Sequence, residues 1–202
     1  MQYEVRNAGA NEDAPLIVLM HGRGASRFDL LGLADHFPSN AALVFPEAPF
    51  NAAQWGYGPG SAWYRFLGRN QPEPESFSTA LTELRDFIAQ FKRSKVVLGG
   101  FSQGGTMSIA YALAHPKEVA GVINFSGFLA DHPSVKVHKA EGTRFFWGHG
   151  MSDPAIPFEL AVEGRKLLGD AGADVTSRNY AIGHWIDPQE LEDAKAWLSS
   201  IL

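Results

Sequence analysis

A serine between glycines follows a short apolar run near the middle of the chain. Residues 95–105 read KVVLGGFSQGG, which places Ser102 at the centre of a Gly-x-Ser-x-Gly pattern. This pattern is typical of a nucleophile elbow, a tight turn from strand to helix that exposes a serine hydroxyl. The run before it is strand-like, and Met107, Ile109 and Leu113 after it follow helical spacing. We therefore predict that Ser102 is a nucleophile, the alternative being a glycine-rich structural turn that contains a serine.

A serine hydroxyl needs a neighbouring base to take its proton, and histidine is the usual one. Of the seven histidines, His184 directly follows the last strand-like run and precedes the last helical one. In the chain order of nucleophile, acid and histidine, that is the position of the base. His21 and His149 also stand at strand ends, each before a glycine, but they come too early in that order. We predict His184 as the base.

Three aspartates compete to be the acid that orients this histidine. Asp153 follows a strand-like run and precedes a proline, which is the usual position of the acid, although a turn aspartate also fits there. Asp187 stands before a proline and three residues before Glu190, the pattern of a helix N-cap, and that role accounts for it fully. Asp131 follows an earlier strand-like run, a less usual place. We favour Asp153.

Two backbone N–H groups are predicted to stabilise the oxyanion of a tetrahedral intermediate. The N–H of Gln103 directly follows the nucleophile and opens a helix. The second is expected from the loop after the strand-like run 16–20, where residues 21–24 read His-Gly-x-Gly. We predict that it is the N–H of Arg23, the alternative being an ordinary glycine turn.

Apolar runs rich in β-branched and aromatic residues alternate with helical patterns along the chain. Strands are predicted over residues 16–20, 42–45, 96–101, 119–125, 144–147 and 174–180, with 2–7 as a possible edge strand. Helices are predicted over residues 77–91, 103–115, 158–168 and 189–198. This alternation predicts an α/β fold: a mostly parallel sheet with helices on both faces and its chemistry at the carboxyl ends of the strands. We expect a single domain over residues 1–202, with minimal or no lid and an open cleft.

Composition excludes several classes of function. The net charge is −5 and no dense cluster of Lys and Arg appears, which argues against a nucleic-acid binder. The chain has no cysteine, so a thiol nucleophile, a disulfide framework and cysteine metal sites are ruled out. Neither a signal-peptide pattern nor an apolar run of membrane-spanning length is present. We expect a cytoplasmic protein without stable membrane insertion.

Aromatic residues among glycines fill the non-periodic segment 50–66. One interpretation is a loop folded on its own aromatic side chains, and the other is the wall of an acyl or aryl pocket. On the second interpretation we expect five residues to bind substrate, namely Trp55, Tyr57, Trp63, Phe128 and Trp185. Arg23 and Arg65 are candidates to meet an anionic group of the substrate, although exposed arginines are more often simply solvated.

The motifs together resemble those of the small carboxylesterase/phospholipase group of α/β-hydrolases, which includes acyl-protein thioesterases and lysophospholipases. The resemblance covers almost the full length, through His-Gly-x-Gly at 21–24, GFSQGG at 100–105, HGxxDPxIP at 149–157 and Gly-His at 183–184. It implies Ser102 as nucleophile, Asp153 as acid, His184 as base, and oxyanion donors at residues 23 and 103. It also implies that no metal or organic cofactor is needed and that a homodimer is possible.

Two positions depart from the family pattern. Arg23 stands where the family commonly has an apolar residue, and Trp185 stands where a glutamate commonly follows the histidine. Both positions lie where substrate would lie, so the substrates of well-known relatives are not transferred to this chain.

We therefore expect a serine hydrolase that cleaves carboxylic esters or thioesters of small to medium acyl chains through an acyl-enzyme. An acyltransferase or perhydrolase that passes the same acyl group to another acceptor is the first alternative. A binding module without turnover on the same scaffold is the second. The triad alone does not separate ester from amide hydrolysis.

Overall fold

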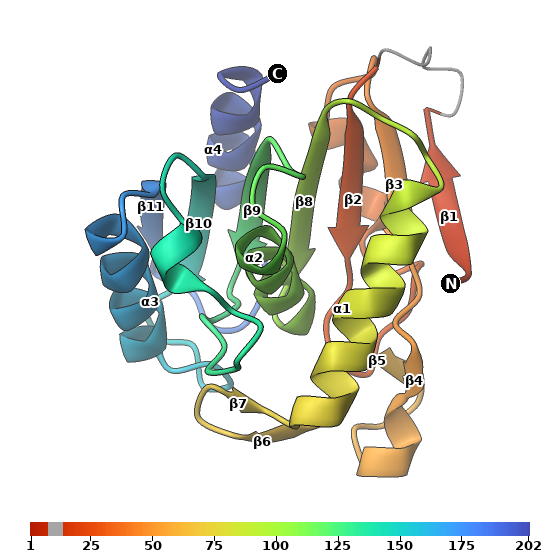
Figure 1. Ribbon diagram of the computed structural model, residues 1–202, viewed down its shortest axis with the longest axis vertical. Helices are drawn as coiled ribbons and strands as arrows, with labels where there is room; N and C mark the ends of the chain where they lie inside the picture. Colours follow the sequence, from red (N-terminus) through yellow and green to blue (C-terminus); the bar gives the residue numbers. More distant parts are fainter. Residues whose placement is uncertain (8–13) are drawn as a thin grey trace.

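A computed structural model of the protein describes residues 1–7 and 14–202. Its centre, within those residues, is a seven-stranded sheet in the order β1-β3-β2-β8-β9-β10-β11 (Figure 1). Its strands are β1 (Tyr3–Arg6), β2 (Leu16–Met20), β3 (Ala42–Pro46), β8 (Val96–Phe101), β9 (Gly121–Phe125), β10 (Arg144–Gly150) and β11 (Asp174–Tyr180). Neighbouring strands are parallel except β1 and β3, so β1 is an antiparallel edge strand. The predicted, mostly parallel sheet is confirmed.

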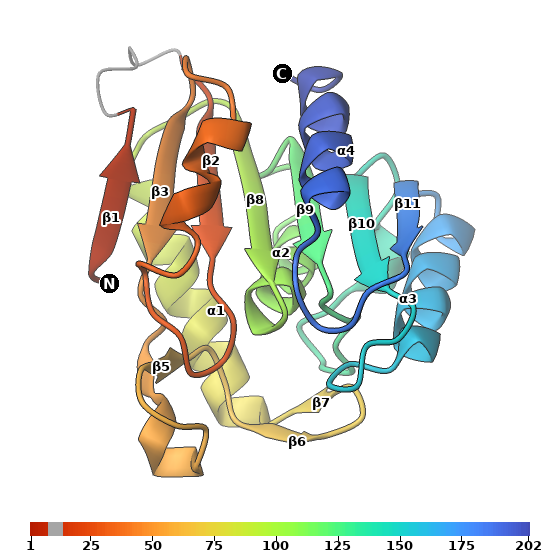
Figure 2. The same cartoon turned by 180° about the vertical axis from the view of Figure 1, so that it is seen from behind.

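Helices cover both faces of the sheet (Figures 1 and 2). One face carries α1 (Pro74–Ala89), α2 (Gln103–Ala114) and α3 (Phe158–Asp170). The other carries α4 (Pro188–Ser199) and the short 3₁₀ helix η1 (Leu31–His36). The beginning of α4 is encoded locally, because Asp187 and Glu190 form a capping box around a proline in the first turn.

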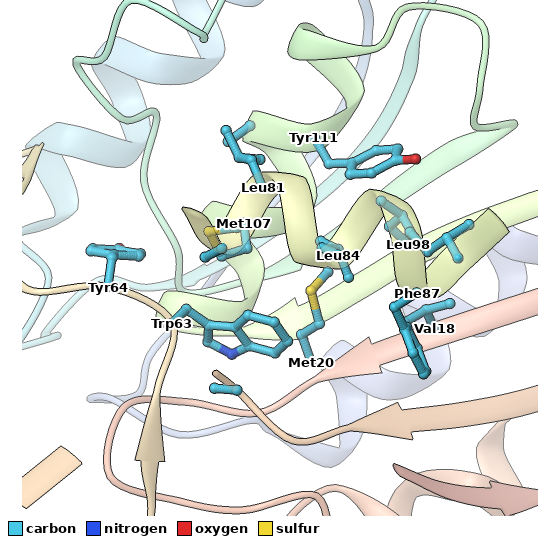
Figure 3. Close-up of a cluster of buried hydrophobic side chains, with 14 of the residues drawn as sticks. Val18, Met20, Trp63, Tyr64, Leu81, Leu84, Phe87, Leu98, Met107 and Tyr111 are labelled. Carbon is cyan, nitrogen blue, oxygen red and sulfur yellow. The ribbon is translucent and has the colours of Figure 1, made fainter. Parts of the chain in front are cut away.

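Two layers of apolar side chains hold these helices to the sheet. Strands β2, β3 and β9 are buried along their whole length, as expected for parallel strands covered on both faces. Figure 3 shows one layer, where Leu84 of α1 and Met107 of α2 lie over Met20 of β2. Alternate strand residues point to the opposite face, where Trp197 of α4 packs. Because β2, β8, β9 and β10 are parallel, their carboxyl ends meet at one edge of the sheet (Figure 2).

The segment between β3 and α1 lies beyond that edge (Figure 1). It folds into two small hairpins with a 3₁₀ turn: β4 (Phe50–Asn51), η2 (Ala52–Trp55), β5 (Ser61–Ala62), β6 (Phe66–Gly68) and β7 (Gln71–Pro72). Sequence spacing missed these elements, since strands of two or three residues are too short to show a periodicity.

Some predicted boundaries also differ. Strand β9 begins at Gly121, two residues later than predicted, and β10 continues to Gly150, three residues further than predicted. A third 3₁₀ helix, η3 (Val137–Lys139), and η1 had no counterpart in the prediction. Among the helices of the described residues, none has the length and apolarity that crossing a membrane requires.

Candidate active site

Ser102 occupies a strained turn between β8 and α2. Its backbone has φ 55° and ψ −114°, a conformation that a residue with a side chain rarely adopts. The turn is held because Ser102 N–H donates to Phe125 O at 2.8 Å and because two glycines allow β2 and α2 to approach closely. A Cβ at Gly104 would overlap the Met20 carbonyl oxygen, and one at Gly100 would lie 2.6 Å from the same oxygen. The glycines of the motif are therefore required by close backbone packing.

The structure brings Ser102, His184 and Asp153 into one chain of hydrogen bonds. The Ser102 hydroxyl donates to His184 Nε2 at 3.0 Å, and His184 Nδ1–H donates to Asp153 Oδ2 at 2.7 Å. Asp153 Oδ1 accepts from the N–H groups of Ala155 and Ile156, both at 2.8 Å, which fixes the carboxylate. The three side chains come from the ends of β8, β10 and β11, as their sequence positions predicted.

Asp153 is suited to remain ionised beside the histidine. Burial acts to raise the pKa of Asp153, but the hydrogen bonds from His184 and from the Ile156 N–H outweigh it and hold the pKa below its usual value. A charged carboxylate in this position stabilises the imidazolium that forms when histidine accepts a proton. Asp153 therefore carries the charge that an acid orienting a histidine needs.

The competing candidates have other partners. Asp187 accepts from the Gln189 N–H at 2.8 Å and caps α4, and Asp131 is exposed to solvent. His21 Nε2 accepts from the Ala48 N–H at 3.1 Å, and burial lowers its pKa. His149 contacts Ile156 O through Nε2 at 3.0 Å and lies 3.6 Å from Asp153, so its partners are on the Asp153 loop.

Arg23 and Gln103, whose N–H groups are the predicted oxyanion donors, line the same cavity as Ser102 and His184. Gln103 is the first residue of α2, and no side chain caps that helix, so its first N–H groups are available to a developing negative charge. The Arg23 N–H has no hydrogen-bond acceptor among residues 1–7 and 14–202. The loop is held at the next residue, where the Gly24 N–H donates to Ser61 O at 2.9 Å.

A cavity of about 200 Å³ lies beside Ser102. Four apolar side chains form much of its wall, namely Phe66, Phe101, Phe128 and Ile156. Two charged residues, Arg23 and Asp29, also line it. Ligand pockets for drug-sized molecules usually measure about 300–1,000 Å³, so this cavity suits a smaller group.

Of the five predicted substrate-binding residues, only Phe128 lines this cavity in the described structure. Trp63 lies in the core instead: it is fully buried, and its indole N–H donates to His21 O at 2.9 Å. Trp185 is 56% exposed and packs over Gly183. Trp55 and Tyr57 do not line the cavity; their rings contact each other at a tilt of 58°, with centroids 5.9 Å apart.

Sequence reasoning missed several residues that line the cavity. Tyr64 and Phe66 belong to the aromatic segment but were not distinguished from their neighbours, and Phe101 is the variable residue of the elbow motif. The side chain of Gln103 was missed as well. Its Oε1 accepts from the backbone N–H of Trp63 at 3.0 Å, and its Nε2 donates to the backbone carbonyl oxygen of Tyr64 at 2.9 Å. It thereby ties the aromatic segment to the elbow.

Over the part of the chain that the structure describes, no group of three or more His, Asp or Glu side chains is placed to hold a metal ion. The chemistry that the arrangement supports is nucleophilic attack by serine with histidine as base.

Comparison with known proteins places this chain in a family. The family profile for phospholipases and carboxylesterases of the α/β-hydrolase type matches residues 1–202. Acyl-protein thioesterase 1 of Emericella nidulans is 28% identical over 92% of this chain and 90% of its own length. A protein of Oryza sativa subsp. japonica named "probable inactive carboxylesterase" is 29% identical over 92% of this chain and 84% of its own. The crystal structure of esterase PE8 is 28% identical, with a TM-score of 0.83 over 98% of each chain. The chain therefore belongs to the phospholipase/carboxylesterase family and is a hydrolase.

Proposed function

We propose that the protein hydrolyses carboxylic esters or thioesters of small to medium acyl chains, with Ser102, His184 and Asp153 as its catalytic triad. The observation that carries this proposal is the hydrogen-bonded chain from Asp153 through His184 to Ser102. Its two links, at 2.7 and 3.0 Å, have the directions that proton removal from the serine requires. Ser102 and His184 line a cavity in which the carbonyl group of a substrate can meet the Ser102 hydroxyl.

The geometry supports a two-step mechanism. His184 Nε2 takes the proton of Ser102 while Oγ attacks the carbonyl carbon, which forms a tetrahedral intermediate. The intermediate expels the alcohol or thiol, which receives that proton from His184, and leaves an acyl-enzyme. Water then attacks the acyl-enzyme, again with His184 as base, and releases the acid. The N–H groups of Arg23 and Gln103 hold the oxyanion in both steps.

The size of the acyl group follows from the cavity. A volume of about 200 Å³ with walls of Phe66, Phe101, Phe128 and Ile156 favours a short or medium apolar chain. The names of the relatives, an acyl-protein thioesterase and an esterase, support both thioesters and oxygen esters as substrates.

The test is hydrolysis of p-nitrophenyl esters from acetate to dodecanoate, together with one matched pair of ester and thioester. Ser102→Ala should reduce kcat by roughly 10³–10⁶. Ser108→Ala is the matched control, since its hydroxyl is also buried on α2 but only donates to Gly104 O. Near-wild-type turnover by Ser102→Ala would refute the assignment.

The same experiment separates the alternatives. If hydrogen peroxide or an alcohol captures the acyl group in preference to water, the protein is a perhydrolase or an acyltransferase that uses the same acyl-enzyme. If wild type neither turns over any ester nor reacts covalently with a fluorophosphonate, the chain is a binding module without turnover; one relative, from rice, is itself named a probable inactive carboxylesterase.

A further inference from the structure

The side chain of Arg23 lies at the mouth of the proposed acyl cavity, on a fixed aromatic platform. It is exposed, it lines the cavity together with Ser102, and its guanidinium carbon lies 4.5 Å from the centre of the Tyr57 ring. Tyr57 is itself held in place, because its hydroxyl accepts from the Phe66 N–H at 2.8 Å. Stacking on a ring orients the plane of a guanidinium and leaves its edges free.

The N–H groups of this guanidinium have no protein acceptor in the part of the chain that the structure describes. No carboxylate lies within 4.0 Å of it there, and it forms no hydrogen bond. Two other exposed arginines differ in this respect. Arg69 and Arg85 pair with Glu163 and Glu118 at 2.8 and 2.6 Å. Arg23 thus combines a fixed orientation with unused donors directly beside the nucleophile.

The geometry points to Arg23 as the residue that selects substrates carrying an anionic group close to the scissile bond. A guanidinium binds planar anions such as carboxylate, or phosphate, through two parallel N–H donors. The same residue supplies a backbone N–H for the oxyanion under the proposed function, on which this inference rests. One residue would therefore hold both the carbonyl oxygen, through its backbone N–H, and the anion, through its side chain.

Asp29 sets a limit on where that anion can lie. Its carboxylate is exposed and lines the same cavity, without an ion pair to Arg23. An anion placed on the Tyr57 side meets the guanidinium, and one placed toward Asp29 is repelled. Asp29→Asn is consequently a useful control, since it removes one charge of opposite sign from the same cavity mouth.

The experiment compares substrates that differ by one carboxylate. On the acyl side the pair is monopropyl glutarate and propyl pentanoate. On the leaving-group side it is the pentanoate ester of 3-hydroxypropanoate and, again, propyl pentanoate. The measured quantity is the ratio of kcat/KM for the anionic over the neutral ester. Any change that Arg23→Gln causes in the oxyanion site affects both members of a pair and cancels in this ratio.

We expect Arg23→Gln to lower the ratio by roughly 10- to 100-fold in one of the two pairs, the range for a lost charged hydrogen bond. The affected pair shows on which side of the ester the anion lies. Arg23→Lys, which keeps the charge but loses the planar donor pair, should fall between Gln and wild type. It also keeps the test decisive if Arg23→Gln does not fold.

Two results would overturn the inference. One is a ratio that neither Arg23 variant changes in either pair. The other is a pair of equal and opposite effects of Arg23→Gln and Asp29→Asn that both vanish in 0.5 M salt, since that pattern means a screened field and no direct contact. In either case, continued turnover of propyl pentanoate that is lost in Ser102→Ala leaves the proposed function standing.

Discussion

Glu190 is a buried carboxyl group whose replacement by glutamine should remove a large pH dependence of stability. It lies in the first turn of α4, fully buried, and occupies the space where a Cβ of Gly148 in β10 would stand. One of its oxygens accepts from the Asp187 N–H at 3.3 Å, and the other has no partner among the described residues. Burial raises the pKa of Glu190 to about 8. The Asp187 N–H and Arg165 oppose this shift, while the charges of Asp187 and Asp193 add to it.

The size and sign of the effect follow from linkage. The unfolded chain releases this proton near the ordinary glutamate pKa of 4.5, whereas the folded chain keeps it up to about pH 8. Between these values the folded state holds more protons, so raising the pH favours unfolding. Each pH unit is worth about 1.4 kcal/mol, and the group alone should therefore lower the free energy of unfolding by about 5 kcal/mol between pH 4.5 and 8.

The assay is urea denaturation of wild type and Glu190→Gln at pH 5, 7 and 8.5. A glutamine keeps the acceptor for the Asp187 N–H but cannot ionise. We expect the two proteins to differ by less than about 1 kcal/mol at pH 5, and the variant to be several kcal/mol more stable at pH 8.5. Glu192→Gln is the matched control on the same helix, because Glu192 is 53% exposed and its substitution should shift stability by less than about 1 kcal/mol.

The opposite result would refute this reasoning. If Glu190→Gln is less stable than wild type at pH 7 and 8.5, then Glu190 is ionised in the folded protein, and its negative charge balances the positive charge of the partly buried Arg165. Removing one partner of a buried ion pair usually costs about 3–5 kcal/mol, so the two cases are far apart.

Two further substitutions test the elbow and its attachment to the aromatic segment. Gly104→Ala should reduce kcat/KM by about 10² or more and lower the melting temperature, because the added Cβ overlaps Met20 O and pushes the elbow away from β2. Wild-type kinetics in this variant would show that the close approach of α2 to β2 is dispensable. Gln103→Leu should lower the free energy of unfolding in urea by about 2–6 kcal/mol, since it leaves the Trp63 N–H and the Tyr64 carbonyl buried without partners. A loss below about 1 kcal/mol would mean that water replaces the amide.

The order of the proposed triad could be predicted because each part depends on local chemistry. Ser102 is marked by glycines that only a tight turn between β8 and α2 requires, and His184 and Asp153 each follow a strand. In a parallel sheet these strand ends share one edge, so positions more than 80 residues apart in sequence converge once the strand order is set. The structure indeed brings the three side chains within hydrogen-bonding distance. Likewise, Asp187 was recognised as a helix cap from its spacing to Glu190 alone.

The cavity wall was decided only by the tertiary structure. Residues 50–72 carry many aromatic side chains, most of them in turns beside strands of only two or three residues, where no periodicity shows which side faces inward. Trp63 was predicted to bind substrate, yet its indole N–H finds His21 O and its ring fills the core, while Phe66 and Phe101 line the cavity. That choice depends on contacts between distant segments, above all the two hydrogen bonds of the Gln103 amide to the Trp63 and Tyr64 backbone. Turns and caps can thus be predicted from neighbouring residues in the sequence, but the direction of each aromatic side chain depends on partners that only folding brings near.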